Sequence, residues 1–156
     1  MSEKSKEEKV ERFRALPAHH VDSSVFIEIL IEQQNKDKCF SYLYNYGKTY
    51  RLCVAISVLG EISKFILEFP TSDLRKSLFE SFRDLIEKFE IEMFVPTFSA
   101  FNIIPALVKI NNRLESMDAL NYACAIDANA EAFITLDTDF DKPLESAFRI
   151  KIKNIS

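Results

Sequence analysis

Residues 116–137 read SMDALNYACAIDANAEAFITLD, and this stretch decides the fold class that we expect. Its first part predicts a helix that Ser116 caps and that runs to about Asn129. Its second part, Ala132–Leu136, is a short and mostly apolar run that predicts a strand followed at once by Asp137. A helix that leads into such a strand is typical of a sheet with helical connections.

The same alternation of strands and helices extends over the rest of the chain. Three further strands are expected before this stretch and one after it: His19–Asp22, Arg51–Ile56, Glu92–Val95 and Phe148–Ile152. Helices are expected from Val25 to near Gly47 with a possible restart, from a Ser57 cap to just before Pro70, from Thr71 to Phe89, and over residues 98–114. We therefore predict a three-layer α/β/α sandwich around a parallel sheet of about five strands.

We expect two regions of unequal size. Residues 1–17 form a charged N-terminal extension, dense in Lys and Glu, that ends at Pro17. A thin apolar stripe of Val10, Phe13 and Leu16 would allow an exposed helix there, although a solvated tail is the simpler interpretation. Residues 18–156 contain no internal repeat and no linker, which favours one compact domain.

Composition excludes several function classes. Only two glycines are present, Gly47 and Gly60, so neither a P-loop nor a dinucleotide fingerprint can be written. The formal net charge is -4, so nucleic-acid binding would have to use local Lys and Arg residues or bound cations.

The three cysteines, Cys39, Cys53 and Cys124, lie far apart among apolar residues, which favours buried free thiols over a zinc site. No apolar run reaches membrane-spanning length, so we expect a cytoplasmic protein that binds no membrane.

Four acidic residues are the candidates for chemistry. Asp22 and Asp137 follow the first and fourth predicted strands, and ligands of parallel sheets bind beyond the carboxyl ends of the strands. Glu61 lies about one turn after the second strand, and Asp118 lies in the first turn of the helix before the fourth. If the first and fourth strands are neighbours, the four carboxylates converge on one crevice.

Carboxylates that converge in this way cannot all stay ionised without a partner, and a bound Mg²⁺ would remove their repulsion. Such an ion lowers the pKa of a bound water and clamps the oxygens of a phosphodiester. Simpler interpretations remain for each acid alone. Asp22 and Asp118 could cap helices, Glu61 could be a surface residue, and Asp137 could belong to an ordinary loop.

At these acids the sequence resembles the PIN-domain family, the nuclease module of VapC-type toxins and of several RNA-processing factors. The matching segments are VDSSVF at 21–26, SVLGEI at 57–62, MDALNYACA at 117–125 and ITLDTDF at 134–140. The resemblance covers roughly residues 19–152 and implies a five-stranded parallel sheet with adjacent first and fourth strands. It also implies a Mg²⁺- or Mn²⁺-dependent endoribonuclease acting on RNA, commonly a homodimer, with a protein antitoxin as partner if the chain is a toxin.

The resemblance implies roles for particular residues as well. Catalysis and metal binding would fall to Asp22, Glu61, Asp118 and Asp137, with Ser23 as a supporting hydroxyl and Asp139 as an extra acid. The family often has Gly before its fourth strand, where this chain has Asn129; Asn tolerates left-handed backbone, so we expect the turn to be preserved. Two other functions stay open: a non-catalytic interaction module on the same fold, and a phosphatase with Asp22 or Asp137 as nucleophile.

Other polar and aromatic residues have simpler interpretations than a catalytic role. His19 and His20 precede Asp22, and a place at the entry of the strand is preferred to a role as metal ligands. Basic residues near the predicted site or on its flanking helices could contact phosphates, but none is singled out: Lys48, Arg51, Lys64, Lys109 and Arg113. For Tyr42, Tyr44, Tyr46 and Tyr50, packing or dimerisation is preferred to base stacking.

Overall fold

The structure, a computed structural model, describes residues 3–156 and contains a parallel sheet of five strands. The strands are β1 (Ala18–Val21), β2 (Arg51–Ala55), β3 (Glu92–Phe94), β4 (Ala132–Thr135) and β5 (Lys151–Asn154). Their order across the sheet is β3-β2-β1-β4-β5, and every neighbouring pair is parallel. The predicted adjacency of the first and fourth strands is confirmed, with Val21 opposite Ile134.

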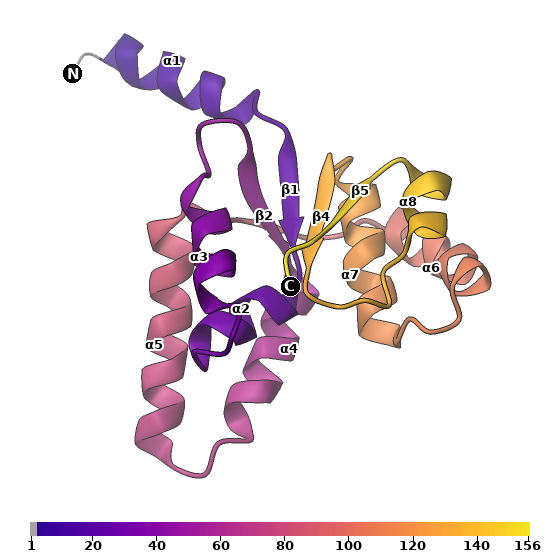
Figure 1. The fold of residues 1–156 in the computed structure, drawn as a ribbon. Coiled ribbons are helices and arrows are strands. Elements are labelled where there is room, and N and C mark those ends of the chain that lie inside the picture. Colours follow the sequence, from indigo (N-terminus) through magenta and orange to yellow (C-terminus); the bar gives the residue numbers. More distant parts are fainter. Residues whose placement is uncertain (1–2) are drawn as a thin grey trace.

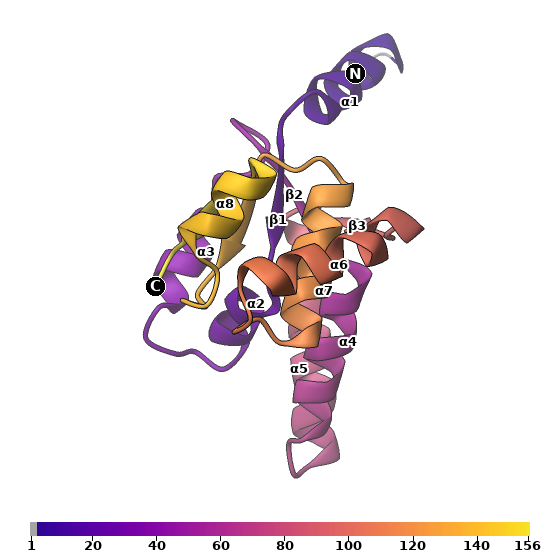
Figure 2. The same ribbon diagram turned by 90° about the vertical axis from the view of Figure 1, so that its right-hand side faces the viewer.

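Helices cover both faces of this sheet. The helices of the described chain are α1 (Glu3–Arg14), α2 (Ser23–Leu30), α3 (Lys36–Tyr44), α4 (Ile56–Leu67), α5 (Ser72–Lys88), α6 (Phe98–Ile110), α7 (Ser116–Asp127) and α8 (Lys142–Phe148). Figure 1 shows α2, α3 and α5 on one side of the sheet and α6, α7 and α8 on the other, and Figure 2 looks onto the second layer. The predicted three-layer sandwich is confirmed.

Each layer of helices has its own apolar core, and β4 contributes to both. Ala132 and Ile134 belong to the core under α2–α5, whereas Phe133 packs with Tyr122 and Leu144 in the core under α6–α8. Successive side chains of a strand point to opposite faces, which explains the alternation. A strand that is buried on both faces in this way is expected to be mostly apolar, and Thr135 is the one polar residue of β4.

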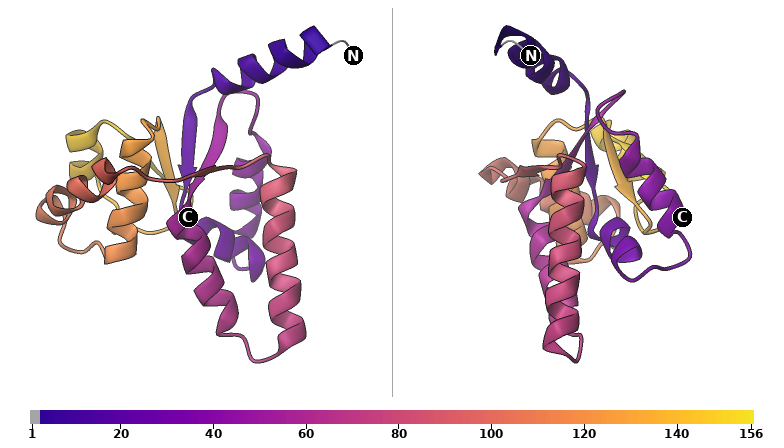
Figure 3. Two further views of the ribbon diagram at one scale, coloured as in Figure 1. Left: turned by 180° about the vertical axis from the view of Figure 1, so that it is seen from behind. Right: turned by 90° about the vertical axis from the view of Figure 1, so that its left-hand side faces the viewer.

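The amino ends of the parallel strands form one edge of the sheet, the amino edge, and their carboxyl ends form the opposite, carboxyl edge. Different structures lie at these two edges. Helix α1 lies at the amino ends of β1 and β2, and the pair α4–α5 extends beyond the carboxyl ends of the strands (Figures 1 and 3). Lys48 and Arg51 belong to the basic residues that were expected near the site or on its flanking helices, but they lie at the amino edge because β2 begins at Arg51. Arg51 forms an ion pair there with Glu92 at 2.9 Å.

The C-terminal region differs from the sequence prediction. A strand was expected over Phe148–Ile152, whereas β5 begins only at Lys151 and the preceding residues form α8. Asp141 caps this short helix by accepting a hydrogen bond from the backbone N–H of Leu144, and a proline lies in its first turn. At Arg149 the backbone turns left-handed, with φ 59°, which ends the helix and directs the chain into the strand.

Two predicted helix caps were also wrong. Ala55 and Glu115, not Ser57 and Ser116, occupy the N-cap positions of α4 and α7. Because Ser57 lies inside its helix, its hydroxyl is available for a tertiary contact, and it donates to Oδ1 of Asn121 at 2.6 Å.

The histidines of β1 are buried in the middle of the sheet. Nδ1 of His19 lies 2.6 Å from the Tyr42 hydroxyl, and its ring stacks on Tyr50 with centroids 4.2 Å apart. His20 packs against the edge of Phe94. Among the described residues, neither Nε2 atom has a hydrogen-bond partner. Tyr42 and Tyr50 therefore serve packing, as preferred from the sequence.

The cysteines are buried free thiols, as predicted: Cys39, Cys53 and Cys124. Within residues 3–156, no helix combines the length and the apolar character needed to cross a membrane.

The turn before β4 has the left-handed backbone that was expected of Asn129, with φ 52°. Its N–H donates to Ile126 O, and the N–H of Ala130 donates to Ala125 O, each at 2.9 Å. These bonds satisfy carbonyls at the end of α7 and set the start of β4.

We predict that Asn129→Ala lowers the free energy of unfolding by about 1 kcal/mol, because a Cβ without a polar group disfavours left-handed backbone. Asn129→Gly should retain the stability of the natural chain. Urea unfolding of the three proteins checks this, and equal midpoints for the Ala variant and the natural chain would contradict it.

Candidate active site

Asp22 is the centre of the candidate site. It follows β1 directly and is only 3% exposed. Its Oδ2 accepts hydrogen bonds from Ser24 Oγ at 2.7 Å and from Thr135 Oγ1 of β4 at 3.0 Å. Although it stands at the N-cap position of α2, its side chain makes no capping bond. Its carboxylate is thus fixed at the junction of β1 and β4 and not used as a helix cap.

A buried amide links Asp22 to a second acid. Asn121 of α7 is 1% exposed, and its Nδ2 donates to Glu61 Oε2 at 2.6 Å and reaches Asp22 Oδ1 at 3.5 Å. The bond from Ser57 to Oδ1 of the same amide fixes which end of Asn121 faces the acids. Because an amide nitrogen only donates, it can hold two carboxylates side by side.

Asp118 lies in the first turn of α7, about one turn before Asn121. Its Oδ2 accepts a hydrogen bond from the N–H of Glu115 at 3.2 Å, so this residue does contribute to the start of the helix. It also lies near enough to Asp22, Asp137 and Glu61 for their charges to raise its pKa. A structural role and a place in the acidic cluster are therefore combined in one side chain.

Asp137 and Asp139 lie in the loop after β4 and have different surroundings. Asp137 accepts a hydrogen bond from the N–H of Asp139 at 2.8 Å, and its own N–H donates to Thr135 Oγ1 at 3.0 Å. Asp139 forms an ion pair with Arg113 at 3.2 Å, and Arg113 also contacts Asp141 at 3.3 Å. Asp137 thus belongs to the loop that touches Asp22 through Thr135, whereas Asp139 has its own cationic partner.

Burial makes it costly for this cluster to be ionised. It raises the pKa of Asp22, although the hydroxyls of Ser24 and Thr135 favour the charged form. Burial also raises the pKa of Glu61, more than the hydrogen bond from Asn121 lowers it. For Asp118, burial and then the charge of Asp22 raise the pKa to about 6. The folded chain therefore holds carboxylates that resist carrying their charges together.

The donor set suits a hard divalent cation. It consists of oxygens, which Mg²⁺ and Mn²⁺ prefer, and a cation would relieve the repulsion that raises these pKa values. The residues that could hold it are Asp22, Glu61, Asp118 and Asp137, and the Ser23 hydroxyl lies beside Glu61. Within residues 3–156, no three His, Cys, Asp or Glu side chains are already arranged as a metal-binding group. Convergence of the four acids on one ion stays a prediction.

Three polar residues of the site were not among the residues that the sequence predicts for it. These are Ser57, Asn121 and Thr135, each of which reaches an acid or the amide that binds the acids. The only sequence signal for Asn121 is its spacing, three residues after Asp118 on the same face of a helix of small residues. Thr135 stands out only as the polar residue of an apolar strand.

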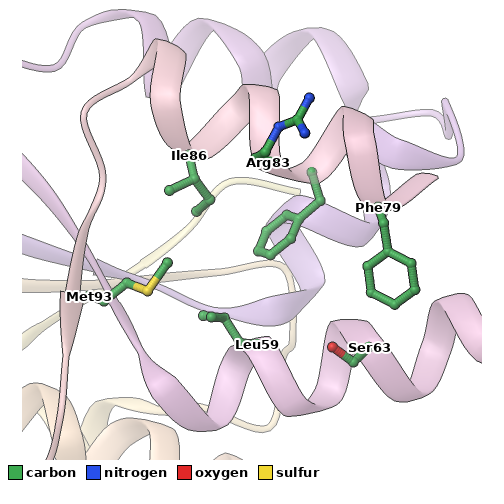
Figure 4. A pocket seen from close by; sticks show the side chains of 7 residues that line it. Leu59, Ser63, Phe79, Arg83, Ile86 and Met93 are labelled. Atoms are coloured by element: carbon green, nitrogen blue, oxygen red, sulfur yellow. The ribbon is translucent and has the colours of Figure 1, made fainter. Parts of the chain in front are cut away.

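A separate hollow lies between α4 and α5 and is largely apolar (Figure 4). Its volume is about 270 Å³, and its lining includes Leu59, Phe79, Ile86 and Met93, with Arg83 beside them. No carboxylate lines this hollow. It is therefore not part of the acidic cluster.

The sequence matches the family model of the PIN domain over residues 20–143. The chain belongs to the PIN domain family. The match includes all four acids of the cluster and leaves α1 outside. No curated protein matches this PIN domain.

Solved structures similar to this PIN domain include toxin–antitoxin proteins. The VapBC2 structure from Rickettsia felis, bound to a promoter DNA fragment, has a TM-score of 0.68 at 12% identity and covers 89% of this chain and 99% of that chain. VapBC-5 from Mycobacterium tuberculosis has a TM-score of 0.62 at 20% identity, with the same coverages. FitAcB from Neisseria gonorrhoeae has a TM-score of 0.62 at 14% identity and covers 87% of this chain and 96% of that chain. At these identities the likeness shows a shared fold.

We predict that Asp118→Asn stabilises the metal-free PIN domain at neutral pH. Because the pKa of Asp118 is raised from 3.8 to about 6, the folded state holds this proton more tightly than the unfolded state does. The stability of the natural chain therefore falls as pH rises through that interval. After allowance for partial solvent screening, the variant should gain about 1 kcal/mol above pH 6. Asn keeps an oxygen that can accept the bond from Glu115.

Thermal unfolding in EDTA at pH 4 and pH 7.5 measures this effect. The gain should raise the midpoint by about 2–4 °C at the higher pH and vanish at the lower one. A variant that is less stable than the natural chain at pH 7.5 would contradict the prediction.

Proposed function

We propose that this PIN domain is a metal-dependent endoribonuclease that hydrolyses RNA phosphodiester bonds with Mg²⁺ or Mn²⁺ as cofactor. The observation that carries the proposal is the buried carboxylate of Asp22, tied to Glu61 through Asn121 at the edge where Asp118 also lies. Membership of the PIN family supports a nuclease. We further propose that residues 18–156 are the nuclease unit and residues 1–17 an extension of it.

The cost of ionising the cluster is what makes it suitable for this role. A bound divalent cation would supply Lewis acidity to a water molecule and to the phosphate. Asp22 is held by hydrogen bonds from Ser24 in the first turn of α2 and from Thr135 at the end of β4. Glu61 is held by Asn121, so these carboxylates are oriented before any ligand binds. Ser57 acts through Asn121 and is a positioning residue. Preorganised ligands of this kind lose little entropy on binding an ion.

Asp22→Asn and Asp118→Asn should each abolish metal-dependent cleavage of single-stranded RNA, because each removes a negative ligand. Asn121→Ala should lower the rate by about 10–100-fold, since it leaves Glu61 without its orienting donor. The measurement is cleavage of an end-labelled RNA with Mn²⁺, with Mg²⁺ and with EDTA.

The matched control is Asp73→Asn, which removes an exposed carboxylate from the first turn of α5, outside the cluster. It should cleave as fast as the natural chain. Full activity in Asp22→Asn or Asp118→Asn would refute the proposed site. Calorimetry with Mn²⁺ tests the alternative function. If a titration with Mn²⁺ produces no heat and Mn²⁺ does not shift the unfolding midpoint, the chain is a non-catalytic interaction module.

We propose a protein antitoxin as one partner of this PIN domain. Support comes from the structural neighbours, several of which are toxin–antitoxin complexes. The hollow between α4 and α5 would offer such a partner mainly apolar contacts, with Arg83 as its one charged side chain. Co-purification of the chain with the product of a neighbouring small reading frame tests the partnership, and its absence from every purified complex would count against it.

We also propose that two copies of this PIN domain associate through an apolar patch after β3. The patch consists of Val95, Phe98 and Phe101, and Phe98 is 86% exposed. The rings of Phe98 and Phe101 lie 6.3 Å apart. Contiguous exposed apolar side chains of this kind mark interfaces.

Sedimentation of the natural chain should show a dimer, and Phe98→Ser combined with Phe101→Ser should convert it to a monomer. Phe79→Ser is a suitable control because Phe79 is an exposed ring in a different place, the α4–α5 hollow. A natural chain that is monomeric at all concentrations, or a double variant that remains dimeric, would overturn this interface.

A further inference from the structure

A groove of basic and aromatic residues lies at the amino edge of the sheet, away from the acidic cluster. It consists of two adjoining hollows, of about 360 and 470 Å³, which share Lys9, Phe13, Gly47 and Lys48. Arg12 completes one hollow, and Tyr44, Tyr46 and Lys88 help to line the other. We call this surface the amino-edge groove.

Helix α1 forms one wall of the amino-edge groove. Lys9, Arg12 and Phe13 share one face of the helix by their spacing, whereas Glu7 and Glu11 fall on the opposite face. The helix therefore presents basic side chains toward the groove, whereas its opposite face mixes Glu7 and Glu11 with Arg14. The family match begins at residue 20, so this wall is a feature of this chain that the family model does not include.

The loop after α3 brings the opposite wall close to α1. Gly47 has φ 74°, and its N–H donates to Tyr50 O at 2.7 Å, which makes a tight turn. The ring of Phe13 lies over this turn, since a Cβ at Gly47 would be 3.8 Å from Phe13 Cε2. Glycine allows this conformation without strain.

Two tyrosines give the groove an aromatic surface. The Tyr46 hydroxyl donates to Lys88 O at 3.2 Å, and its ring packs edge-on against Phe89 with centroids 5.7 Å apart. Tyr44 is 60% exposed, and Lys88 Nζ lies 6.0 Å from the centre of its ring. An exposed ring beside ammonium groups can stack on a base while the cations contact the neighbouring phosphates.

The charge of the groove is the reverse of the charge of the chain. Four cationic side chains line it, Lys9, Arg12, Lys48 and Lys88, with Glu90 as its one acid. No ion pair joins any of these four to a carboxylate among the side chains that the structure describes. On a chain of net charge -4, such a local excess selects a polyanion.

We propose that the amino-edge groove binds single-stranded RNA through phosphate contacts to these cations and base stacking on Tyr44. The choice of RNA rests on the proposed function. The groove and the acids lie at opposite ends of β1, a strand of four residues, which spans roughly 13 Å. An RNA strand long enough to pass over the covering helices would contact the groove and the acidic cluster at the same time, and the groove would then anchor RNA away from the scissile bond.

The test is fluorescence anisotropy with a labelled single-stranded RNA of mixed sequence, about 12 nucleotides long, a length within the range of single-strand sites. EDTA prevents cleavage and leaves the acidic cluster without a cation, so that it repels RNA. The natural chain should bind with a logarithmic salt slope of about -3, as expected for four single-strand phosphate contacts. Lys9→Glu with Arg12→Glu should weaken binding at least tenfold and reduce the slope by about half.

Tyr44→Leu should weaken binding at least about fivefold without changing the salt slope, because it removes stacking and no charge. The matched control, Lys38→Glu with Lys76→Glu, changes the net charge equally at exposed lysines outside the groove and should bind like the natural chain. Thermal unfolding of each variant verifies that it is folded.

The outcomes separate this inference from the proposed function. Asp118→Asn should still bind RNA in EDTA, so loss of cleavage with retained binding concerns the acids alone. If both groove variants bind like the natural chain, or if the control variant loses affinity equally, the groove does not bind RNA. Sedimentation of the groove variants adds a further readout. A change of oligomeric state without any RNA affinity would assign the groove to contacts between protein chains.

Discussion

The site depends on the parallel pairing of β1 with β4. Asp22 enters the fold as an extension of β1, its N–H donates to Ile134 O at 2.9 Å, and its carboxylate accepts from Thr135. A shift of one residue in this register would reverse the faces of β4 and would place Phe133 in the wrong core. The cores on both faces of the sheet therefore fix the position of the acid, although neither core contains it.

Electrostatic strain and stability are balanced within the carboxylate cluster. Burial disfavours the ionised forms of Asp22 and Glu61, whereas hydrogen bonds from hydroxyls and an amide favour these forms. The donors do not cancel the effect of burial, so the pKa values remain raised. Charged groups that fold close together at such a cost are typical of functional sites. Asp139 differs from these acids in that it is paired with a cation, Arg113.

The sequence was sufficient to predict the layers and the parallel sheet, which follow from short-range patterns of apolar strands and helical periodicity. The adjacency of β1 and β4 was implied by the resemblance to the PIN-domain family and not by these patterns. The position of Asn121 between Glu61 and Asp22 could not be predicted, because it depends on side chains about 60 and 99 residues apart in sequence. Helix α8 was missed because it is short and is set by the Asp141 cap and not by periodicity.

The burial of two histidines in β1 has a consequence for acid tolerance. The pKa values of His19 and His20 are each lowered to about 4, mainly by burial, so the unfolded chain takes up protons at a higher pH than the folded chain does. As the pH falls below 6.5, the imidazoles therefore favour unfolding, whereas protonation of Asp22, which follows the same strand, and of Asp118 favours folding. Acidification thus acts in opposite directions on the histidines within the sheet and on the carboxylates beyond its strands, so the two titrations oppose each other in the stability of the molecule.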